Sequence, residues 1–170
     1  MNIELRQLSF HDGIDVYQML QEIPKDENGF INGGNGKTFD DYKQWLMKQD
    51  NMASGIDLED WMVPSTTFWL FVDDLPVGFG KLRHYLTDKL KEDGGHAGYA
   101  IRPLYRNKGY GKLLLKILME QANLMGIDKL LLTIQNDNER SIKVALANGG
   151  VIEKVTDIRH FIWIDCNAAR

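Results

Sequence analysis

The chain has a single cysteine, four prolines and no long apolar or basic run in its 170 residues. Cys166 is the lone cysteine, which excludes an internal disulfide and a multi-cysteine metal site. The longest apolar stretches, such as 68–72, fall far short of the roughly 20 residues that a membrane-spanning helix needs. The first ten residues lack a basic segment followed by an apolar one, so no signal peptide is expected.

The 20 basic and 24 acidic residues give a net charge of −4. A general nucleic-acid-binding surface is therefore not expected. Hydrophobic residues make up 44% of the chain and no Pro-rich or Ser-rich linker divides it, which favours one globular domain over residues 1–170. These features predict a soluble cytoplasmic protein with no nucleic-acid or membrane partner, and they leave monomer and homodimer open.

Hydrophobic periodicity predicts a mixed α/β fold with alternating strands and amphipathic helices. The expected strands are 2–9, 66–72, 77–86, 96–102, 129–134, 151–155 and 159–164. The expected helices lie between Asp12 and Pro24, from Thr38, at 109–125 and at 139–147, and Asp12 with Asp15 resembles a capping box for the first. The segment Asn28–Gly36 holds four glycines and three asparagines, which predicts a mobile loop without regular structure.

Residues 96–134 have the pattern of strand, helix and strand. The last of these, 129–134, is a continuous apolar run, which is typical of a strand buried on both faces in parallel pairing. The length suits a βαβ unit.

The most informative segment is the hexapeptide 106–111, Arg-Asn-Lys-Gly-Tyr-Gly. It lies where the expected strand 96–102 leads into the expected helix 109–125. The first amide groups of a helix have no internal acceptor, and the helix dipole adds positive charge there, so this junction is suited to binding an anion. Gly109 and Gly111 carry no Cβ atoms that would hold a diphosphate away from these amides. Arg106, Lys108 and Lys112 add cations, so the segment predicts a site for a nucleotide-like diphosphate.

The hexapeptide matches neither of two common phosphate loops. Leu113 follows Gly111-Lys112 where a Walker A loop requires Ser or Thr, and Leu114 takes the third glycine position of a dinucleotide-binding loop. Its Arg-x-x-Gly-x-Gly pattern, after Tyr99-Ala100-Ile101, resembles the pyrophosphate loop of the GNAT superfamily of acyl-CoA-dependent N-acetyltransferases. The later segment Asn138-Glu139-Arg140-Ser141, with Gly149 beyond it, is similar to that family's second half.

The resemblance implies a single-domain GNAT-like fold. That fold has a mixed, mostly antiparallel sheet, helices on both faces, and a splayed parallel strand pair, here 96–102 and 130–135. It also implies an N-acetyltransferase that moves an acetyl group from acetyl-CoA to a small-molecule or protein primary amine by direct attack, without a metal. A backbone N–H near Ile101 would polarise the acetyl carbonyl. By the same resemblance, the residues that bind the co-substrate acetyl-CoA are Ile101, Arg106, Asn107, Lys108, Gly109, Tyr110, Gly111, Lys112, Asn138 and Ser141.

The catalytic groups are not assigned by the resemblance. Where relatives carry a base on the strand before the loop, this chain has Tyr99, Ala97 and Gly95. His96 stands at an odd offset, which predicts that it faces the other side of the strand, and His84 is a second weak candidate. Many relatives have a tyrosine that protonates the leaving thiolate at the position where this chain has Ala145. Three alternatives follow: another hydroxyl, such as that of Tyr99, protonates the thiolate, the thiolate leaves unassisted, or the protein is a catalytically inactive CoA-binding sensor. A separate hypothesis is an unrelated phosphate-binding protein.

The acceptor is open as well. By resemblance, Asn28–Gly36 is either an acceptor lid or a flexible connection. Large aromatic side chains, Trp45, Trp61, Phe68 and Trp69, either line an acceptor pocket or belong to the core. The acidic residues Asp57, Glu59 and Asp60 form either an amine-attracting cluster or a solvated turn. The net charge of −4 mildly favours a cationic acceptor.

Overall fold

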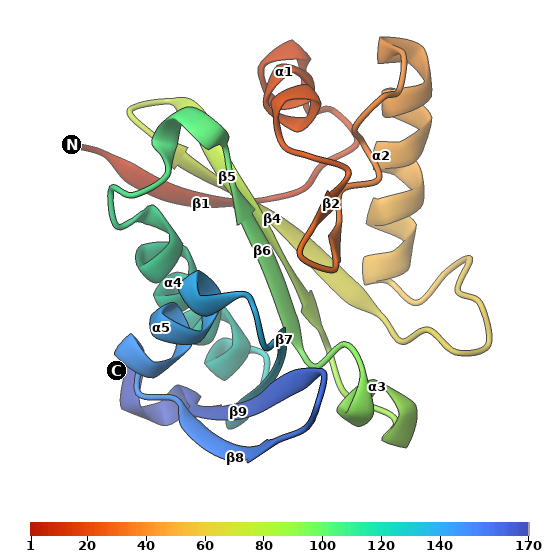
Figure 1. Ribbon diagram of the computed structural model, residues 1–170. Coiled ribbons are helices and arrows are strands. Elements are labelled where there is room, and N and C mark those ends of the chain that lie inside the picture. The colour runs from red at the N-terminus through yellow and green to blue at the C-terminus, as the bar shows by residue number, and fades with distance from the viewer. Residues whose placement is uncertain (170) are drawn as a thin grey trace.

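The computed structural model, which describes residues 1–169, contains two larger β-sheets that meet at one end, and a two-stranded hairpin (Figure 1). The first sheet has the order β1-β4-β5-β6, with every neighbouring pair antiparallel. Its strands are β1 (Ile3–Gln7), β4 (Ser65–Val72), β5 (Leu75–Arg83) and β6 (Ala97–Ile101). The second sheet has the order β7-β9-β8 and is also antiparallel. Its strands are β7 (Lys129–Gln135), β8 (Val151–Val155) and β9 (Arg159–Asp165).

The strands β6 and β7 join the two sheets without forming a regular ladder. They meet where the His96 N–H donates to the Leu131 carbonyl oxygen at 2.8 Å. Gly95 permits this approach, because its φ is 63° and a Cβ atom there would lie only 2.4 Å from the Leu131 oxygen. Beyond this point the strands diverge. The expectation of a mostly antiparallel sheet with a splayed strand pair is therefore confirmed.

Helices cover both faces of the first sheet (Figure 1). On one face, α1 (Ile14–Glu22) and α2 (Phe39–Ala53) pack against Trp69, Phe71 and Phe79. The other core contains buried residues of α4 (Tyr110–Leu124) and α5 (Glu139–Ala147). The short helical elements are α3 (Asp88–Glu92) and the 3₁₀ turns Pro103–Tyr105 and Cys166–Ala169. None of the helices within residues 1–169 is long and apolar enough to cross a membrane.

The start of the first helix differs from the prediction. Gly13 occupies the N-cap position and makes no side-chain cap. The Asp12 carboxylate instead accepts hydrogen bonds from the Ser9 N–H at 2.8 Å and from the Trp69 indole N–H at 2.7 Å. A capping box led by Asp12 is therefore wrong. This residue ties the chain before α1 to β4, because a buried indole N–H must find an acceptor.

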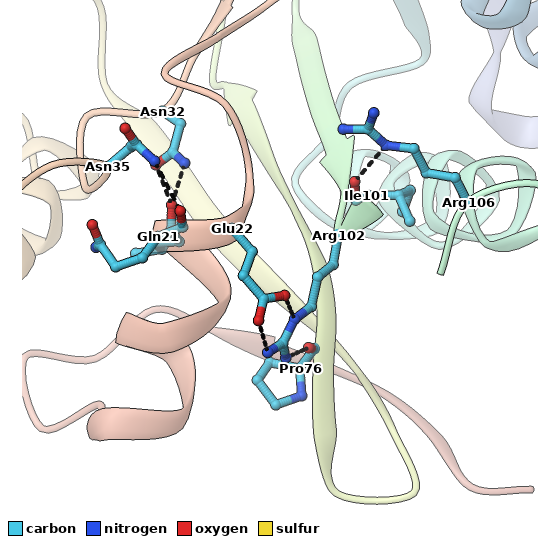
Figure 2. A network of polar contacts seen from close by, with 9 residues as sticks. Gln21, Glu22, Asn32, Asn35, Pro76, Ile101, Arg102 and Arg106 are labelled. Carbon is cyan, nitrogen blue, oxygen red and sulfur yellow. Dashed lines mark hydrogen bonds and ion pairs between the residues drawn. The ribbon is translucent and has the colours of Figure 1, made fainter. Parts of the chain in front are cut away.

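Within the segment Asn28–Gly36, Phe30 and Ile31 form a short strand, so the prediction that the segment has no regular structure is wrong at these two residues. The short strands β2 (Asp26–Glu27) and β3 (Phe30–Ile31) form a hairpin. The Asn32 amide is fully buried and donates to the carbonyl oxygens of Leu20 and Ile23, both at 2.9 Å. Figure 2 shows Asn32 and Asn35 directed at this end of α1. The asparagines satisfy carbonyl groups that a helix end leaves without partners, which sequence composition alone does not reveal.

A second polar link joins α1 to the end of β6 (Figure 2). The Arg102 guanidinium pairs with the Glu22 carboxylate through two nitrogens and donates to the Pro76 carbonyl oxygen at 3.1 Å. A fork of this kind fixes the direction of both groups. The hairpin, α1 and the exit of β6 are thereby held together beside the splay.

Candidate active site

A cavity of about 1200 Å³ lies where β6 and β7 diverge. Its walls come from β6, the turn that leads into α4, the end of β7, the start of α5 and the β2–β3 hairpin. Lining residues belong to both faces of the sheet: Tyr99 and Ile101 pack with the core of α4, whereas Phe30 packs with the core of α1 and α2. The cavity therefore gives access to the β6 edge from two sides.

The turn before α4 carries a run of free backbone donors. The N–H groups of residues 107–112 donate no hydrogen bond within the part of the chain that the structure describes, and the first helical bond runs from Leu113 to Gly109. Asn107 and Gly109 adopt left-handed conformations, with φ of 61° and 84°. This backbone bends the chain sharply from the 3₁₀ turn into the helix. The arrangement places the positive end of α4 at the cavity wall, where an anion is favoured.

Gly111 lines the same cavity and has an ordinary helical backbone. A Cβ atom on it would lie 3.8 Å from Tyr99 and 3.9 Å from Ile101 and Val144, which are normal contact distances. Protein packing therefore does not require glycine here. The missing side chain leaves room against the free amides, which fits a bound diphosphate.

Arg106 lines the cavity, but its guanidinium is already engaged by protein groups. Its Nε donates to the Ile101 carbonyl oxygen at 3.0 Å (Figure 2). Its Nη2 lies 3.2 Å from the Glu27 carboxylate. Nη2 nevertheless has no hydrogen-bond partner of ordinary geometry among the described residues, so the role of Arg106 at the diphosphate stays a prediction. Arg106 connects the end of β6 to the β2–β3 hairpin.

The other expected members of the turn divide into two groups. Asn107, Gly109, Gly111 and Lys112 line the cavity, whereas Lys108 and Tyr110 do not. The Lys108 ammonium lies 5.5 Å from the Tyr105 ring centre, and the Tyr110 hydroxyl contacts the sulfur of Met1. Lys108 and Lys112 are exposed and contribute positive charge near the turn.

Asn138 and Ser141 both line the cavity at the start of α5. The Asn138 side-chain oxygen caps this helix by accepting from the Ser141 N–H at 3.3 Å. The Asn138 side-chain nitrogen donates to no acceptor within residues 1–169, so it remains available to a ligand. The cap explains why these two residues stand three positions apart.

The Tyr99 hydroxyl is the most distinctive polar atom of the cavity. It is buried and has no hydrogen-bond partner of ordinary geometry among the described residues. Burial raises the pKa of Tyr99 to about 12, and the nearby Ser141 side chain offsets part of that rise. A buried hydroxyl without a partner is costly, which marks this atom as a candidate for ligand contact.

The two candidate histidines are held in structural contacts. His96 is 8% exposed, and its Nδ1 accepts a hydrogen bond from the Leu131 N–H at 2.9 Å. Burial, reinforced by Arg83 and Lys91, lowers the pKa of His96 to about 4, so the ring is neutral at pH 7. The His84 Nε2 lies 2.7 Å from the Thr66 hydroxyl, and His84 is not among the cavity-lining residues.

On the side of the cavity opposite α4, two cations of β5 appear that sequence reasoning missed. Lys81 and Arg83 are half-buried and line the cavity. Burial, with a smaller effect of Arg83, lowers the pKa of Lys81 to about 8. The only sequence signal was their alternation with apolar residues in the strand, which does not reveal where the cavity opens.

The cavity-lining carboxylates are Glu27, Asp93, Asp137 and Glu139. Glu27 pairs with Arg106, and Asp93 pairs with Arg159 at 3.1 Å. Asp137 and Glu139 are exposed at the start of α5. Within residues 1–169 no group of three His, Cys, Asp or Glu side chains is placed to hold a metal ion.

The aromatic and acidic candidates for acceptor binding are mostly elsewhere. Trp45, Phe68 and Trp69 belong to the hydrophobic cores, and only Trp61 lines the cavity. The cluster of Asp57, Glu59 and Asp60 is exposed and outside the cavity lining. Glu59 accepts a hydrogen bond from the Trp61 indole at 2.7 Å. The solvated-turn interpretation of the acidic cluster agrees with this arrangement.

A cavity between splayed strands, with free amides at the head of a helix, has the geometry of a site for an anionic ligand. The family model described as acetyltransferase (GNAT) family matches residues 35–149. The chain belongs to this family and is an acyltransferase. A search of curated protein sequences finds no match.

Solved structures share the fold at low sequence identity. The Campylobacter jejuni N-acetyltransferase PseH in complex with acetyl coenzyme A is 14% identical, with a TM-score of 0.63 over 96% of this chain and 99% of that chain. A spermidine N-acetyltransferase SpeG chimera from Vibrio cholerae and hSSAT is 13% identical, with a TM-score of 0.67 over 99% and 98%. RimL, a ribosomal-protein alpha-N-acetyltransferase in complex with coenzyme A, is 13% identical, with a TM-score of 0.68 over 97% and 94%.

Proposed function

We propose that the chain transfers an acetyl group from acetyl-CoA to a primary amine by direct attack, without a covalent enzyme intermediate. The observation that carries this proposal is the run of unbonded N–H groups at residues 107–112, which opens on the cavity beside Gly111. Family membership supports acetyl transfer, and structures of similar fold contain acetyl coenzyme A or coenzyme A. The acceptor class within this proposal is a small-molecule or protein amine.

The amides of residues 107–112 would hold the diphosphate of acetyl-CoA, with Lys108 and Lys112 adding long-range attraction. The pantetheine arm would then run along the uncovered edge of β6 as an added strand. Backbone groups of alternate strand residues point to opposite edges, and the Arg102 N–H points to β5. Ile101 and Tyr99 would accordingly present their N–H groups to the cavity, and the Asn138 amide would reach the arm from the other side.

In the reaction the amine nitrogen bonds to the acetyl carbonyl carbon, and the carbon–sulfur bond breaks to release the coenzyme A thiolate. A backbone N–H of Tyr99 or Ile101 stabilises the charge on the carbonyl oxygen. The Tyr99 hydroxyl, which has no protein partner among the described residues, donates its proton to the thiolate. Because burial raises the pKa of Tyr99 to about 12, this hydroxyl holds its proton at neutral pH.

The incoming amine must be neutral to attack, and an ordinary lysine-like amine has a pKa of about 10.4. His96 is tied to β7, and the carboxylates of Glu27 and Asp93 are ion-paired. The other two cavity carboxylates, Asp137 and Glu139, are exposed at the start of α5, so we assign removal of the amine proton to water in the cavity.

One observation favours a second candidate, a catalytically inactive CoA-binding sensor. Ala145 replaces the acidic tyrosine of many relatives, and it is fully buried in the core. In that case acetyl-CoA binds but no amine is acetylated.

The test combines a thermal-unfolding assay with a measurement of coenzyme A release. Acetyl-CoA at 100 times its dissociation constant should stabilise the fold by about 2.7 kcal/mol, or roughly 5–10 °C in a domain of this size. A panel of primary amines should then release coenzyme A in an enzyme-dependent way. Stabilisation without release would favour the sensor, and an absence of both would refute acetyl-CoA as the ligand.

A further inference from the structure

Two cations form one wall of the acceptor side of the cavity. Lys81 and Arg83 stand two residues apart on β5, so their side chains share one face of the strand. Lys81 is paired with Gly98 of β6 in the sheet register, three residues before Ile101. The cations thus lie beside the same strand whose edge faces the splay, on the face opposite α4.

Neither cation has a carboxylate partner within 4.0 Å in the part of the chain that the structure describes. The Lys81 ammonium donates to the neutral Gln49 amide oxygen at 3.1 Å, and Arg83 donates to the Gly95 carbonyl oxygen at 2.9 Å. Asp93 attracts Arg83 from farther away, but it forms its ion pair with Arg159. Lys81, Arg83 and Arg159 stand against Asp93 here, and the other carboxylate of this side, Glu27, is paired with Arg106.

Half-buried charges without a counter-charge are unfavourable, because desolvation is not repaid by a Coulombic partner. Burial lowers the pKa of both Lys81 and Arg83; Arg83 lowers that of Lys81 further, whereas Asp93 offsets part of the lowering at Arg83. Nonpolar side chains of Phe30, Trp61 and Met62 line the cavity as well. An anion placed here would be held in surroundings less polar than bulk water, where the attraction is stronger.

We infer that the acceptor carries an anionic group, a carboxylate or a phosphate, which binds at Lys81 and Arg83 while its amine is presented at the β6 edge. This inference rests on the proposed function and names its substrate class. It differs from the expectation drawn from the net charge, which favours a cationic acceptor. Local charge decides recognition at contact, because charges farther away than about 8 Å are largely screened at physiological salt.

The test compares matched amines with and without the anionic group. Alanine and ethylamine, 4-aminobutyrate and propylamine, and phosphoethanolamine and ethanolamine are assayed for acetyl-CoA-dependent release of coenzyme A, with spermidine as a cationic acceptor. At least one carboxylate or phosphate compound should exceed its partner in kcat/KM by about tenfold or more. The amino acid pairs test a carboxylate, and phosphoethanolamine tests a phosphate.

Lys81→Gln should abolish most of this preference by raising KM for the anionic acceptor, with kcat changed less than about threefold. Arg83→Lys keeps the charge and should retain the preference, which guards against a folding defect from loss of the Arg83 contact. Lys116→Gln, at an exposed position on α4, is the matched control and should behave as the parent.

The outcomes separate this inference from the proposed function. If acetyl-CoA stabilises the protein but only spermidine or the neutral amines are acetylated, or if no compound of the panel is, the anionic-acceptor inference is overturned. A preference that survives Lys81→Gln overturns it as well. If acetyl-CoA neither stabilises the protein nor reacts, the proposed function itself fails.

Discussion

The imidazole of His96 accepts a hydrogen bond from the Leu131 N–H at 2.9 Å, while the His96 N–H donates to the Leu131 carbonyl at 2.8 Å. The residue directly before β6 thus satisfies both backbone groups of one residue of β7. This reciprocal pair closes one end of the splay, and the cavity opens beyond it. His96 lines the cavity next to β6, yet both of these contacts give it a structural role, and its role in proton transfer stays a prediction.

His96→Ala should destabilise the protein, because the buried Leu131 N–H loses its acceptor. The expected loss at pH 7.5 is about 1–3 kcal/mol, measured by urea unfolding. Exposed His11→Ala serves as the control and should change stability by less than about 0.5 kcal/mol. Normal stability combined with lost turnover would instead support His96 as a catalytic base.

The same residue predicts a pH dependence of stability. The pKa of His96 is lowered from 6.5 to about 4, so between these values the unfolded chain binds a proton that the folded chain does not. Stability from this residue is complete above pH 6.5 and is lost as the pH falls towards 4, by about 3 kcal/mol. Urea unfolding of the parent and His96→Ala from pH 7.5 to 4.5 should show a shallower decline in the variant. Equal slopes would contradict the lowered pKa.

Gly111→Val should prevent stabilisation by acetyl-CoA while leaving the fold intact. The valine side chain has ordinary contacts with Tyr99, Ile101 and Val144 at its Cβ, but it projects into the space beside the free amides. The expected result is a native far-UV spectrum and a thermal shift with acetyl-CoA of less than about 1 °C, against roughly 5–10 °C for the parent. Exposed Gly13→Val, whose backbone is extended, is the matched control and should keep the full shift. A full thermal shift with acetyl-CoA in Gly111→Val would show that the diphosphate binds elsewhere.

The parts of this site that can be predicted from the sequence are those whose residues lie close together along the chain. The turn at 106–111 is predictable, since glycine positions, cations and the change of hydrophobic period all lie within one short segment. The position of Lys81 depends on the β5–β6 register and on Gln49 of α2, which are distant in sequence. The turn of His96 towards β7 depends on the positive φ of Gly95 and on its contact with Leu131. Local motifs therefore indicate the donor site, whereas the acceptor side requires the folded chain.

Tyr99→Phe should lower kcat by about 10²-fold or more, because general acid catalysis typically contributes that much. The ring stays, so binding of acetyl-CoA and thermal stability should remain close to those of the parent. Tyr105→Phe, which also alters a cavity-lining tyrosine, is the control and should retain kcat within about threefold. The measurement is steady-state release of coenzyme A with the best acceptor. If Tyr99→Phe keeps the parent kcat, the thiolate leaves without this proton.

Asn32→Ala should show that the segment 28–36 is anchored to α1. The Asn32 amide is fully buried, donates to Leu20 and Ile23, and accepts from the Gly34 N–H at 3.2 Å. Removing it leaves the Gly34 N–H without this acceptor and leaves the two carbonyls only the Asn35 amide, which should cost about 1–3 kcal/mol and lower the midpoint of thermal unfolding by several degrees. Exposed Gln44→Ala on α2 should cause no comparable loss. An unchanged midpoint in Asn32→Ala would instead indicate that this segment contributes little to the folded state, as a mobile lid would, and that the hairpin does not depend on the asparagine contacts with α1.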